Sequence, residues 1–417
     1  MSDREVGACR EGVVVISRLR IGIIAPEFPP EVGGMQTMAL QIALHIAKSH
    51  EVVVCTRGSL RTEGYGFTVL ANLCGKTNRD LIALNRIDVD VWLAMNAGYV
   101  AIAKILHKPL IAYFHGNDFL NPWVVSTPFL LRLLSRFPVG SMAWSEKRRD
   151  YARKKMRAGV ASALKILTNS SNTKSLICQR YPHQQDVVIC PPGVNSMFFQ
   201  NYAKRDVDTS VLTLLTVSRL EKATRRKNIE GVLRALALLK TTLRVRYSIV
   251  GDGDDRQTLT ELSDNLSLSD CVTFLGRVSD EDLLELYRKA DLFVLPAKAS
   301  PLDVEGFGIV YLEANACGVP VLCSAAGGAT DAVIDGQTGI VLESAYPDQI
   351  AEGILRFARF SGAFKTDQLR SFASNFTWEI AAARIEAQIL SSLETFRACG
   401  PANLPGNLAP NTCMYNT

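Results

Sequence analysis

Residues 303–318 read DVEGFGIVYLEANACG, an acidic loop flanked by glycines and followed by a helix predicted from about Gly308 to Gly318. Apolar runs at 292–295 and 319–323 lie on either side, and each has the length and composition of a buried strand. A strand, a helix and a second strand in this order form a βαβ unit with parallel strands. This part of the chain therefore predicts a parallel α/β sheet with a glycine-rich loop at the end of a strand.

The same alternation of short apolar runs and segments of helical period continues through the chain. The polar stretch 201–210 interrupts it, and a fresh strand signal follows. We predict two α/β domains at 18–200 and 211–375, a helix at 376–398 that crosses back to the N-terminal domain, and a disordered tail at 400–417. The predicted strands are 21–25, 51–55, 91–94, 110–114, 165–168, 187–190, 211–217, 245–250, 272–275, 292–295, 319–323 and 339–342, and the clearest helices are 35–48, 229–240 and 280–289.

Composition narrows the classes of function. A chain of 417 residues, 47 % of them hydrophobic, is long enough for two domains, because single cores stop growing at roughly 250 to 300 residues. A net charge of +5 is modest, so we expect no nucleic-acid partner. The ten cysteines show no CxxC pair or zinc-finger spacing, which favours a reduced, cytoplasmic protein. No segment approaches the ~20 apolar residues that cross a bilayer, so we expect a soluble or peripheral protein.

The acidic loop before the helix also suggests a ligand. A helix start offers free backbone N–H groups, and glycines let an anion such as a diphosphate approach closely. Glu305 would then lie beside a sugar, and Glu313, two turns along the helix, would reach a ribose diol. The alternatives are structural: Glu305 favours the helix dipole and Glu313 is a surface residue.

The spacing of Glu305 and Glu313, with seven residues between them, resembles the signature of family 4 of the retaining glycosyltransferases. These enzymes have the GT-B fold, an α/β architecture of two Rossmann-like domains that face a central cleft. The segment 302–306 is closest to that of mannosyltransferases acting on phosphatidylinositol-type lipids, and the resemblance covers roughly residues 20–390. The other matching segments, in the family's order, are 27–34, 190–195, 217–220 with Lys227, 251–253, 274–276 and 327–336.

The resemblance implies a site for a nucleotide diphosphate sugar, with no metal and no further cofactor. In the family, the first glutamate of the motif lies next to the transferred sugar and the second holds the ribose hydroxyls. An arginine and a lysine bind the diphosphate. We predict catalytic roles for His115, Arg219, Lys227 and Glu305, and donor contacts from Gly33, Gly34, Arg219, Lys227, Val278, Glu305, Phe307, Gly308, Ile309 and Glu313.

Arg219 and Lys227 also have a physical rationale. A diphosphate leaving group gains negative charge as the glycosidic bond breaks, and each fixed cation aimed at it is worth roughly 10² to 10³ in rate. The guanidinium of an arginine binds phosphate oxygens in two places. Inserted residues between the two cations, and Asn228 where the family mostly has Gly, depart from the family pattern. The alternative is that Arg225, Arg226 and Lys227 form a solvated basic loop.

Three further polar residues are candidates at strand ends. His115 follows the predicted strand 110–114, and a histidine at the matching position in the family hydrogen-bonds the donor sugar; the alternative is a structural histidine. We assign Asp118 to orienting the acceptor. Asp331 lies in a glycine-rich stretch in a similar position, and a helix-capping role suits it equally well.

Other motifs are set aside. Gly251-Asp252-Gly253 is not a complete GxGxxG, and the chain has no GxxxxGK[ST], so neither NAD nor P-loop chemistry is indicated. The triplets 88–90 and 252–254 mimic the metal-binding DxD of the other large glycosyltransferase fold. We interpret both as structural and predict no metal site.

The segment 129–157 combines leucines with many basic residues, opposed only by Glu146 and Asp150. Each basic residue near an anionic leaflet contributes about 1 kcal/mol, so this segment would hold the protein at the inner face of the cell membrane. The alternative is a solvated helix face. The basic residues are Arg132, Arg136, Lys147, Arg148, Arg149, Arg153, Lys154, Lys155 and Arg157.

These observations predict a retaining glycosyltransferase that moves a hexose, with mannose favoured, from a GDP- or UDP-linked donor to a glycolipid or polysaccharide intermediate. The donor's leaving phosphate would accept the acceptor proton, so no separate general base is required. The alternatives are a sugar-nucleotide epimerase of the same fold, a nicotinamide-dependent oxidoreductase, and a non-catalytic sugar-nucleotide sensor. The sequence leaves the donor base, the acceptor, the linkage and the oligomeric state open.

Overall fold

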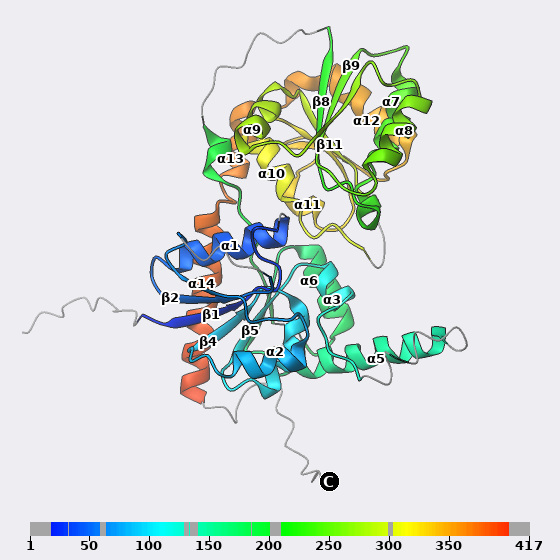
Figure 1. The fold of residues 1–417 in the computed structure, drawn as a ribbon. Coiled ribbons are helices and arrows are strands. Elements are labelled where there is room, and N and C mark those ends of the chain that lie inside the picture. The colour runs from blue at the N-terminus through cyan, green and yellow to red at the C-terminus, as the bar shows by residue number, and fades with distance from the viewer. Residues whose placement is uncertain are drawn as a thin grey trace, which may run out of the picture.

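The computed structural model describes residues 18–31, 33–58, 64–128, 133, 141–184, 186–200, 210–298 and 303–399. They form two α/β domains, each built around a parallel sheet. In Figure 1 the N-terminal domain lies below and the C-terminal domain above. The linker predicted at 201–210 falls almost wholly outside the described residues, and so does the tail from residue 400.

The N-terminal sheet has seven strands in the order β3-β2-β1-β4-β5-β6-β7, and all its pairs are parallel. Its central strands are apolar along their whole length because helices cover both faces. The strand order reverses between β1 and β4, which leaves room for a ligand beyond their carboxyl ends. The strands are β1 (Arg20–Ile24), β2 (Glu51–Cys55), β3 (Thr68–Leu70), β4 (Val91–Ala94), β5 (Leu110–Phe114), β6 (Lys165–Thr168) and β7 (Val187–Ile189).

The C-terminal sheet has six parallel strands in the order β10-β9-β8-β11-β12-β13. Its order reverses between β8 and β11, so the two sheets share one design. The carboxyl ends of both sheets turn toward the boundary between the domains. The strands are β8 (Leu212–Val217), β9 (Val245–Val250), β10 (Val272–Gly276), β11 (Leu292–Leu295), β12 (Val321–Ser324) and β13 (Gly339–Leu342).

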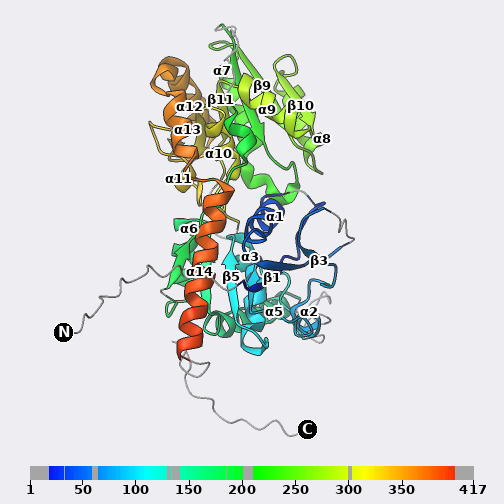
Figure 2. The same cartoon turned by 90° about the vertical axis from the view of Figure 1, so that its left-hand side faces the viewer.

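Helices pack on both faces of each sheet (Figures 1 and 2). Helix α9 (Asp280–Lys289) shows why they form where they do. Ser279 caps its first turn by accepting from Asp282 N, three acidic residues occupy that turn, and two basic residues occupy the last. Further α-helices are α1 (Gly34–Ile46), α2 (Thr77–Leu84), α3 (Asn117–Leu120), α5 (Ser141–Val160), α6 (Ser171–Arg180), α7 (Ile229–Leu239), α8 (Arg256–Asn265), α10 (Ile309–Ala316), α11 (Ala329–Ala332), α12 (Pro347–Phe360) and α13 (Thr366–Ala373). The 3-10 helices are η1 (Ala97–Ile105), η2 (Ser196–Phe199), η3 (Lys222–Lys227) and η4 (Ser361–Ala363).

The last helix, α14 (Trp378–Cys399), leaves the C-terminal domain and runs along the N-terminal domain, as Figure 2 shows. Its apolar side chains, Ile385 and Ile389 among them, belong to the N-terminal core. Glu386 of this helix lies 3.1 Å from Nε2 of the buried His50. The helix therefore joins the two domains through the N-terminal core.

All twelve predicted strands are present, and their limits shift by two residues at most. The sequence analysis misses β3, because an edge strand of three residues is too short to show a pattern. Within the described part of the chain, no helix combines the length and the apolar character that crossing a membrane requires.

Candidate active site

The starts of α1 and α10 face each other across the boundary between the domains. A Cβ placed on Gly34, the first residue of α1, would lie 3.7 Å from Cδ1 of Ile309, the first residue of α10. Neither helix has a side-chain hydrogen bond at its N-cap, so no side chain competes there for the first N–H groups. The predicted donor residues Gly33, Gly34, Gly308 and Ile309 therefore come together at a place suited to an anion.

Glu305 lies in the loop between β11 and α10 and is only 6 % exposed. Its Oε2 accepts hydrogen bonds from Lys227 Nζ and, at 2.6 Å, from Arg226 Nη1. Burial alone would raise the pKa of this carboxyl, but the two cations outweigh that effect and lower the pKa to about 2. Glu305 is therefore an anion at neutral pH, held by two cations.

Glycines shape the loop that carries Glu305. A Cβ on Gly306 would lie 2.4 Å from the carbonyl oxygen of His115 in the other domain, closer than a real side chain tolerates. Gly308 has a φ of +90°, which side chains rarely adopt, and a Cβ there would lie 2.3 Å from the ring of Tyr311. The first glycine permits the close approach of the two domains, and the second permits the sharp entry into α10.

Arg226 and Lys227 reach Glu305 from η3, which contains the residues that interrupt the family's spacing. Their side chains are 11 % and 18 % exposed, so the alternative of a solvated basic loop is wrong for both. Their neighbour Arg225 anchors η3 through hydrogen bonds of 2.9 and 2.5 Å to Asp255. The inserted segment thus supplies a cation, Arg226, that the sequence analysis did not place in the site.

Asn228 ends η3 in the left-handed conformation, with a φ of 60°. Glycine adopts this conformation freely, and asparagine does so more readily than other residues. The side-chain amide of Asn228 donates to the carbonyl oxygens of Pro296 and Ala345. The backbone therefore explains why Asn stands where the family mostly has Gly.

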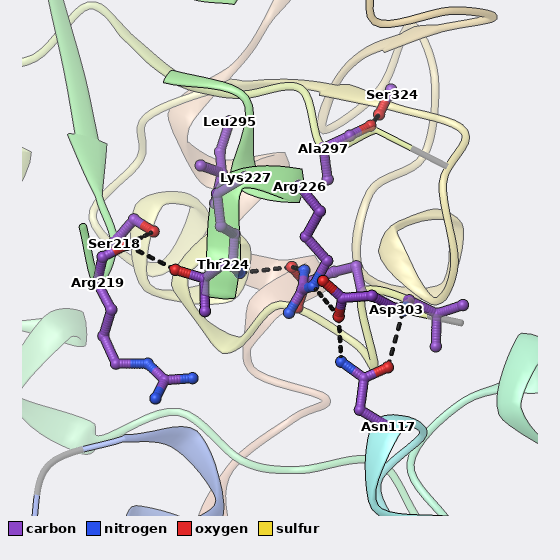
Figure 3. Close-up of polar contacts among 12 residues, drawn as sticks. Asn117, Ser218, Arg219, Thr224, Arg226, Lys227, Leu295, Ala297, Asp303 and Ser324 are labelled. Carbon is purple, nitrogen blue, oxygen red and sulfur yellow. Dashed lines mark hydrogen bonds and ion pairs between the residues drawn. The ribbon is translucent and has the colours of Figure 1, made fainter. Parts of the chain in front are cut away.

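Arg219 lies just beyond β8 and is 56 % exposed, with an ion pair of 3.3 Å to Glu221. In Figure 3 its side chain extends from the C-terminal domain toward the N-terminal domain, apart from Lys227. Burial and the neighbouring Asp118 raise the pKa of Glu27, in the N-terminal domain, to about 6, and the charge of Arg219 opposes that rise. The exposure of Arg219 leaves it able to turn toward an anionic ligand.

His115 follows β5 and is half-buried. Burial lowers its pKa to about 4, so the ring is neutral at pH 7. Its Nε2 lies 3.0 Å from the carbonyl oxygen of Met95, which can only accept, so Nε2 carries the proton. The other ring nitrogen, Nδ1, is therefore an acceptor that a sugar hydroxyl can use.

Asp118 makes its contacts within the N-terminal domain. Its two carboxylate oxygens accept hydrogen bonds from the backbone N–H groups of His115 and Ala97, at 2.9 and 2.8 Å. Burial raises the pKa of Asp118 to about 6, although these hydrogen bonds oppose the rise. Asp118 therefore holds the loop that carries His115, and its role in orienting the acceptor stays a prediction.

Glu313 lies on α10 and is half-buried, unlike the surface residue of the alternative interpretation. Its Oε2 accepts a hydrogen bond of 2.8 Å from the hydroxyl of Tyr287. Burial raises the pKa of Glu313 to about 7, against the effect of that hydrogen bond. The carboxyl is thus partly protonated near neutral pH and has one oxygen that Tyr287 does not use.

Two predicted donor contacts belong to the hydrophobic core. The side chain of Phe307 is 2 % exposed, and its ring centroid lies 5.8 Å from that of Phe376. The ring of Phe307 therefore belongs to the core, and its donor contact stays a prediction that the backbone would meet. Val278 is half-buried and packs against the same cluster, so its donor contact stays a prediction.

The sequence analysis also misses polar contacts between the domains. Asn117 bonds Asp303, and Ser171 donates from N and Oγ to the two oxygens of Asp331, at 2.5 Å each. Asp331 therefore binds the first residue of α6 in the other domain, although the N-cap residues of α6 and α11 are Ser170 and Gly328. No local signal shows these pairs, because their partners are 186 and 160 residues apart in the sequence.

The two aspartate triplets have structural partners. Asp90 accepts from Arg20 N at 2.8 Å, and Asp254 accepts from Lys222 N at 2.7 Å. Over the described residues, no group of three or more histidines, cysteines and acids is placed to hold a metal ion.

The basic segment is described only in part, because residues 129–132 and 134–140 lie outside the described ranges. Its remainder forms α5, which extends away from the rest of the N-terminal domain in Figure 1. Arg148, Arg149 and Lys154 are exposed on this helix, and Lys155 is half-buried. The membrane-binding and solvated-face interpretations both fit this placement.

Two family models match the chain, one after the other. The model described as "Glycosyltransferase Family 4" matches residues 32–197, and the model described as "Glycosyl transferases group 1" matches residues 200–362. The first covers most of the N-terminal domain and the second most of the C-terminal domain.

The chain is similar in sequence to proteins that are named as glycosyltransferases. A GDP-mannose-dependent alpha-(1-6)-phosphatidylinositol monomannoside mannosyltransferase from Mycolicibacterium smegmatis is 25 % identical over 88 % of this chain and 97 % of its own length. A D-inositol 3-phosphate glycosyltransferase from Mycobacterium marinum is 26 % identical over 88 % of this chain and 83 % of its own length. A GDP-mannose-dependent monoacylated alpha-(1-6)-phosphatidylinositol monomannoside mannosyltransferase from Corynebacterium glutamicum is 38 % identical over 30 % of this chain and 33 % of its own length.

Solved structures share the fold. A sucrose-phosphate synthase from Thermosynechococcus elongatus superposes with a TM-score of 0.71 at 19 % identity, covering 91 % of this chain and 100 % of that one. Anabaena HepE in complex with UDP and glucose superposes with a TM-score of 0.68 at 19 % identity, covering 90 % and 100 %.

Proposed function

The chain belongs to family 4 of the glycosyltransferases with the GT-B fold, and on that premise we propose that it transfers a mannosyl group from GDP-mannose with retention of configuration. The acceptor is a glycolipid or a polysaccharide intermediate. One arrangement carries this proposal: Glu305 and Lys227 are held together beside the start of α10, opposite the glycine-rich start of α1.

The donor diphosphate occupies the start of α10, where backbone N–H groups and the helix dipole favour an anion. Arg219 turns from Glu221 toward it, and Lys227 contacts it from beside Glu305. Both cations stabilise the charge that develops as the bond between C1 and the phosphate oxygen breaks. The leaving phosphate takes the proton of the acceptor hydroxyl on the same face, while that hydroxyl oxygen bonds to C1.

Three side chains receive the rest of the donor. Glu305, which is ionised, lies beside the sugar and stabilises the positive charge that grows on its ring. Nδ1 of His115 accepts a hydrogen bond from a sugar hydroxyl. The free oxygen of Glu313 accepts from the ribose hydroxyls.

The donor and the acceptor class rest on the relatives. The mannosyltransferases from M. smegmatis and C. glutamicum are named as GDP-mannose-dependent, and both act on phosphatidylinositol mannosides. A lipid acceptor would lie in the membrane, and the exposed basic side chains of α5 would then bind the anionic inner face of the cell membrane.

The epimerase and oxidoreductase alternatives have no support from the family models or from these relatives. A sensor without activity is disfavoured because Arg219, Lys227 and Glu305 are all present.

Thermal shift followed by product analysis tests the proposal. Among GDP-, UDP-, ADP- and dTDP-linked sugars at equal concentration, GDP-mannose should raise the melting temperature most, because the ligand with the lowest Kd stabilises the folded protein most. A ligand at a hundred times its Kd adds about 2.7 kcal/mol to the free energy of unfolding. NMR of the product should show an α-linked mannose, and EDTA should leave the activity unchanged. A β-linked product, or activity lost with EDTA and restored by Mg²⁺ or Mn²⁺, would contradict the proposed mechanism.

A further inference from the structure

Asn117 and Asp303 connect the two domains at the edge of the site (Figure 3). The side-chain amide of Asn117, at the start of α3, donates to Asp303 Oδ1. Its carbonyl oxygen accepts from Val304 N at 2.8 Å. Asn117 therefore uses both ends of its amide on one loop of the C-terminal domain, the loop that leads to Glu305.

Arg226 continues this chain of contacts inside the C-terminal domain. Its Nε donates to the same oxygen of Asp303 at 2.7 Å, and its Nη1 donates to Glu305 at 2.6 Å. The two nitrogens belong to one planar, rigid group, so the position of one fixes the position of the other. A displacement of Asp303 must therefore reach Glu305 through the guanidinium.

Burial makes the loss of any of these contacts costly in free energy. Glu305 is 7 % exposed at its side chain and Arg226 11 %, so water cannot freely replace a lost partner. Asp303 is 33 % exposed and completes the charge balance, with two acids against Arg226 and Lys227. Among the described side chains of the N-terminal domain, Asn117 is the one with a hydrogen bond to Asp303.

We propose that Asn117 is a positioning residue that couples closure of the two domains to the placement of Glu305, acting through Asp303 and Arg226. This inference rests on the proposed function, because Glu305 must lie beside the donor sugar for its placement to matter. The contacts of Asn117 exist only when the domains are closed, so Glu305 has its full set of supports only in that state. The nucleotide part of the donor does not depend on this relay.

A second contact between the same domains provides a control. Ser171 and Asp331 are joined by two hydrogen bonds, but neither side chain bonds Asp303, Arg226 or Glu305. Loss of this pair weakens closure without breaking the relay. Asn117→Ala and Asp331→Ala therefore separate the two effects.

The test compares the affinities for GDP-mannose and for GDP by titration calorimetry, with UDP-glucose and UDP as a second pair. Asn117→Ala should weaken binding of the nucleotide sugar about tenfold more than it weakens binding of the free nucleotide, because it removes the relay to Glu305 as well as a contact between the domains. Asp331→Ala should weaken both equally. If Asn117→Ala also weakens both equally, Asn117 is only a domain contact and the inference fails; equal affinities in Asn117→Ala and the wild type overturn it as well.

A charge exchange gives an independent check. Asn117→Asp places a second carboxylate against Asp303 and should weaken nucleotide-sugar binding more than Asn117→Ala does. Adding Asp303→Asn places an amide donor at position 303 against the carboxylate acceptor at position 117, so the double variant should recover at least part of the lost affinity. No recovery would count against the inference. If the wild type binds none of these ligands, the proposed function fails instead, which distinguishes the two failures.

Discussion

The guanidinium of Arg226 lies 2.6 Å from the carboxylate of Glu305, and the two side chains are only 11 % and 7 % exposed. Arg226 belongs to a segment that lengthens the spacing between Arg219 and Lys227, and the sequence analysis did not place this residue in the site. The consequence is that Glu305 has two cationic partners, Arg226 and Lys227, although the resemblance assigns Lys227 to the diphosphate. Removal of one partner leaves a buried charge with less compensation.

Acid should destabilise the protein partly through Glu305. The pKa of this carboxyl is lowered from 4.5 to about 2 in the folded state, so it adds stability above pH 4.5 that is lost as the pH falls toward 2. The shift corresponds to roughly 3 kcal/mol at neutral pH. Urea unfolding at pH 6 and pH 3 measures this: wild type should lose more stability between the two than Glu305→Gln does. Glu261→Gln, on an exposed helix face, is the control, and equal losses in all three proteins would contradict the assignment.

Steady-state kinetics should show different roles for the donor-binding residues Arg219 and Glu313. Arg219 faces charge that grows in the transition state, so Arg219→Ala should lower kcat by roughly 10² or more. Glu313 holds the ribose throughout the reaction, so Glu313→Ala should mainly raise the donor KM, by the equivalent of roughly 1.5 to 3 kcal/mol. Kinetics at saturating donor decide between them. An effect of Arg219→Ala on KM alone, with kcat lost in Glu313→Ala, would reverse the two roles.

Donor binding should depend on pH through Glu313. Burial raises the pKa of this carboxyl to about 7, and only its ionised form accepts from both ribose hydroxyls. The donor KM should therefore fall as the pH rises from 6 to 8, by up to roughly tenfold for a single titrating group. Tyr287→Phe removes a hydrogen bond that lowers this pKa, so the fall should move to higher pH. Glu313→Gln should have no such dependence, and a KM that varies equally in this variant would exclude Glu313 as its source.

Helix α5 should bind anionic membranes if its basic face has the proposed use. The protein should sediment with liposomes containing phosphatidylglycerol and leave them at high salt, because screening shortens the reach of surface charge. Replacing the four residues Arg148, Arg149, Lys154 and Lys155 by Glu should abolish this. The same charge change on the C-terminal domain, at Arg234, Lys240, Arg244 and Arg246, is the matched control. Sedimentation that persists in the α5 variant would leave only the solvated-face interpretation.

The sequence by itself determined the two parallel sheets and the core of the site. Buried strands such as 91–94 and 292–295 are continuous apolar runs, and their limits can be recognised because segments of helical period and turns lie between them. Glu305, Gly308 and Glu313 are found because they lie within one loop and one helix, where local spacing fixes their separation. Asn228 could be noticed as a departure, although only its φ of 60° explains it.

The tertiary structure alone decided which side chains meet. Arg226 looked like one member of a basic run, and it enters the site because η3 turns it toward Glu305. Asp118 followed His115 closely enough to suggest a shared ligand, yet its oxygens are committed to backbone N–H groups. The pairing of Asn117 with Asp303 has no trace in the sequence, because side chains 186 residues apart become neighbours only when both sheets have formed and the domains lie against each other.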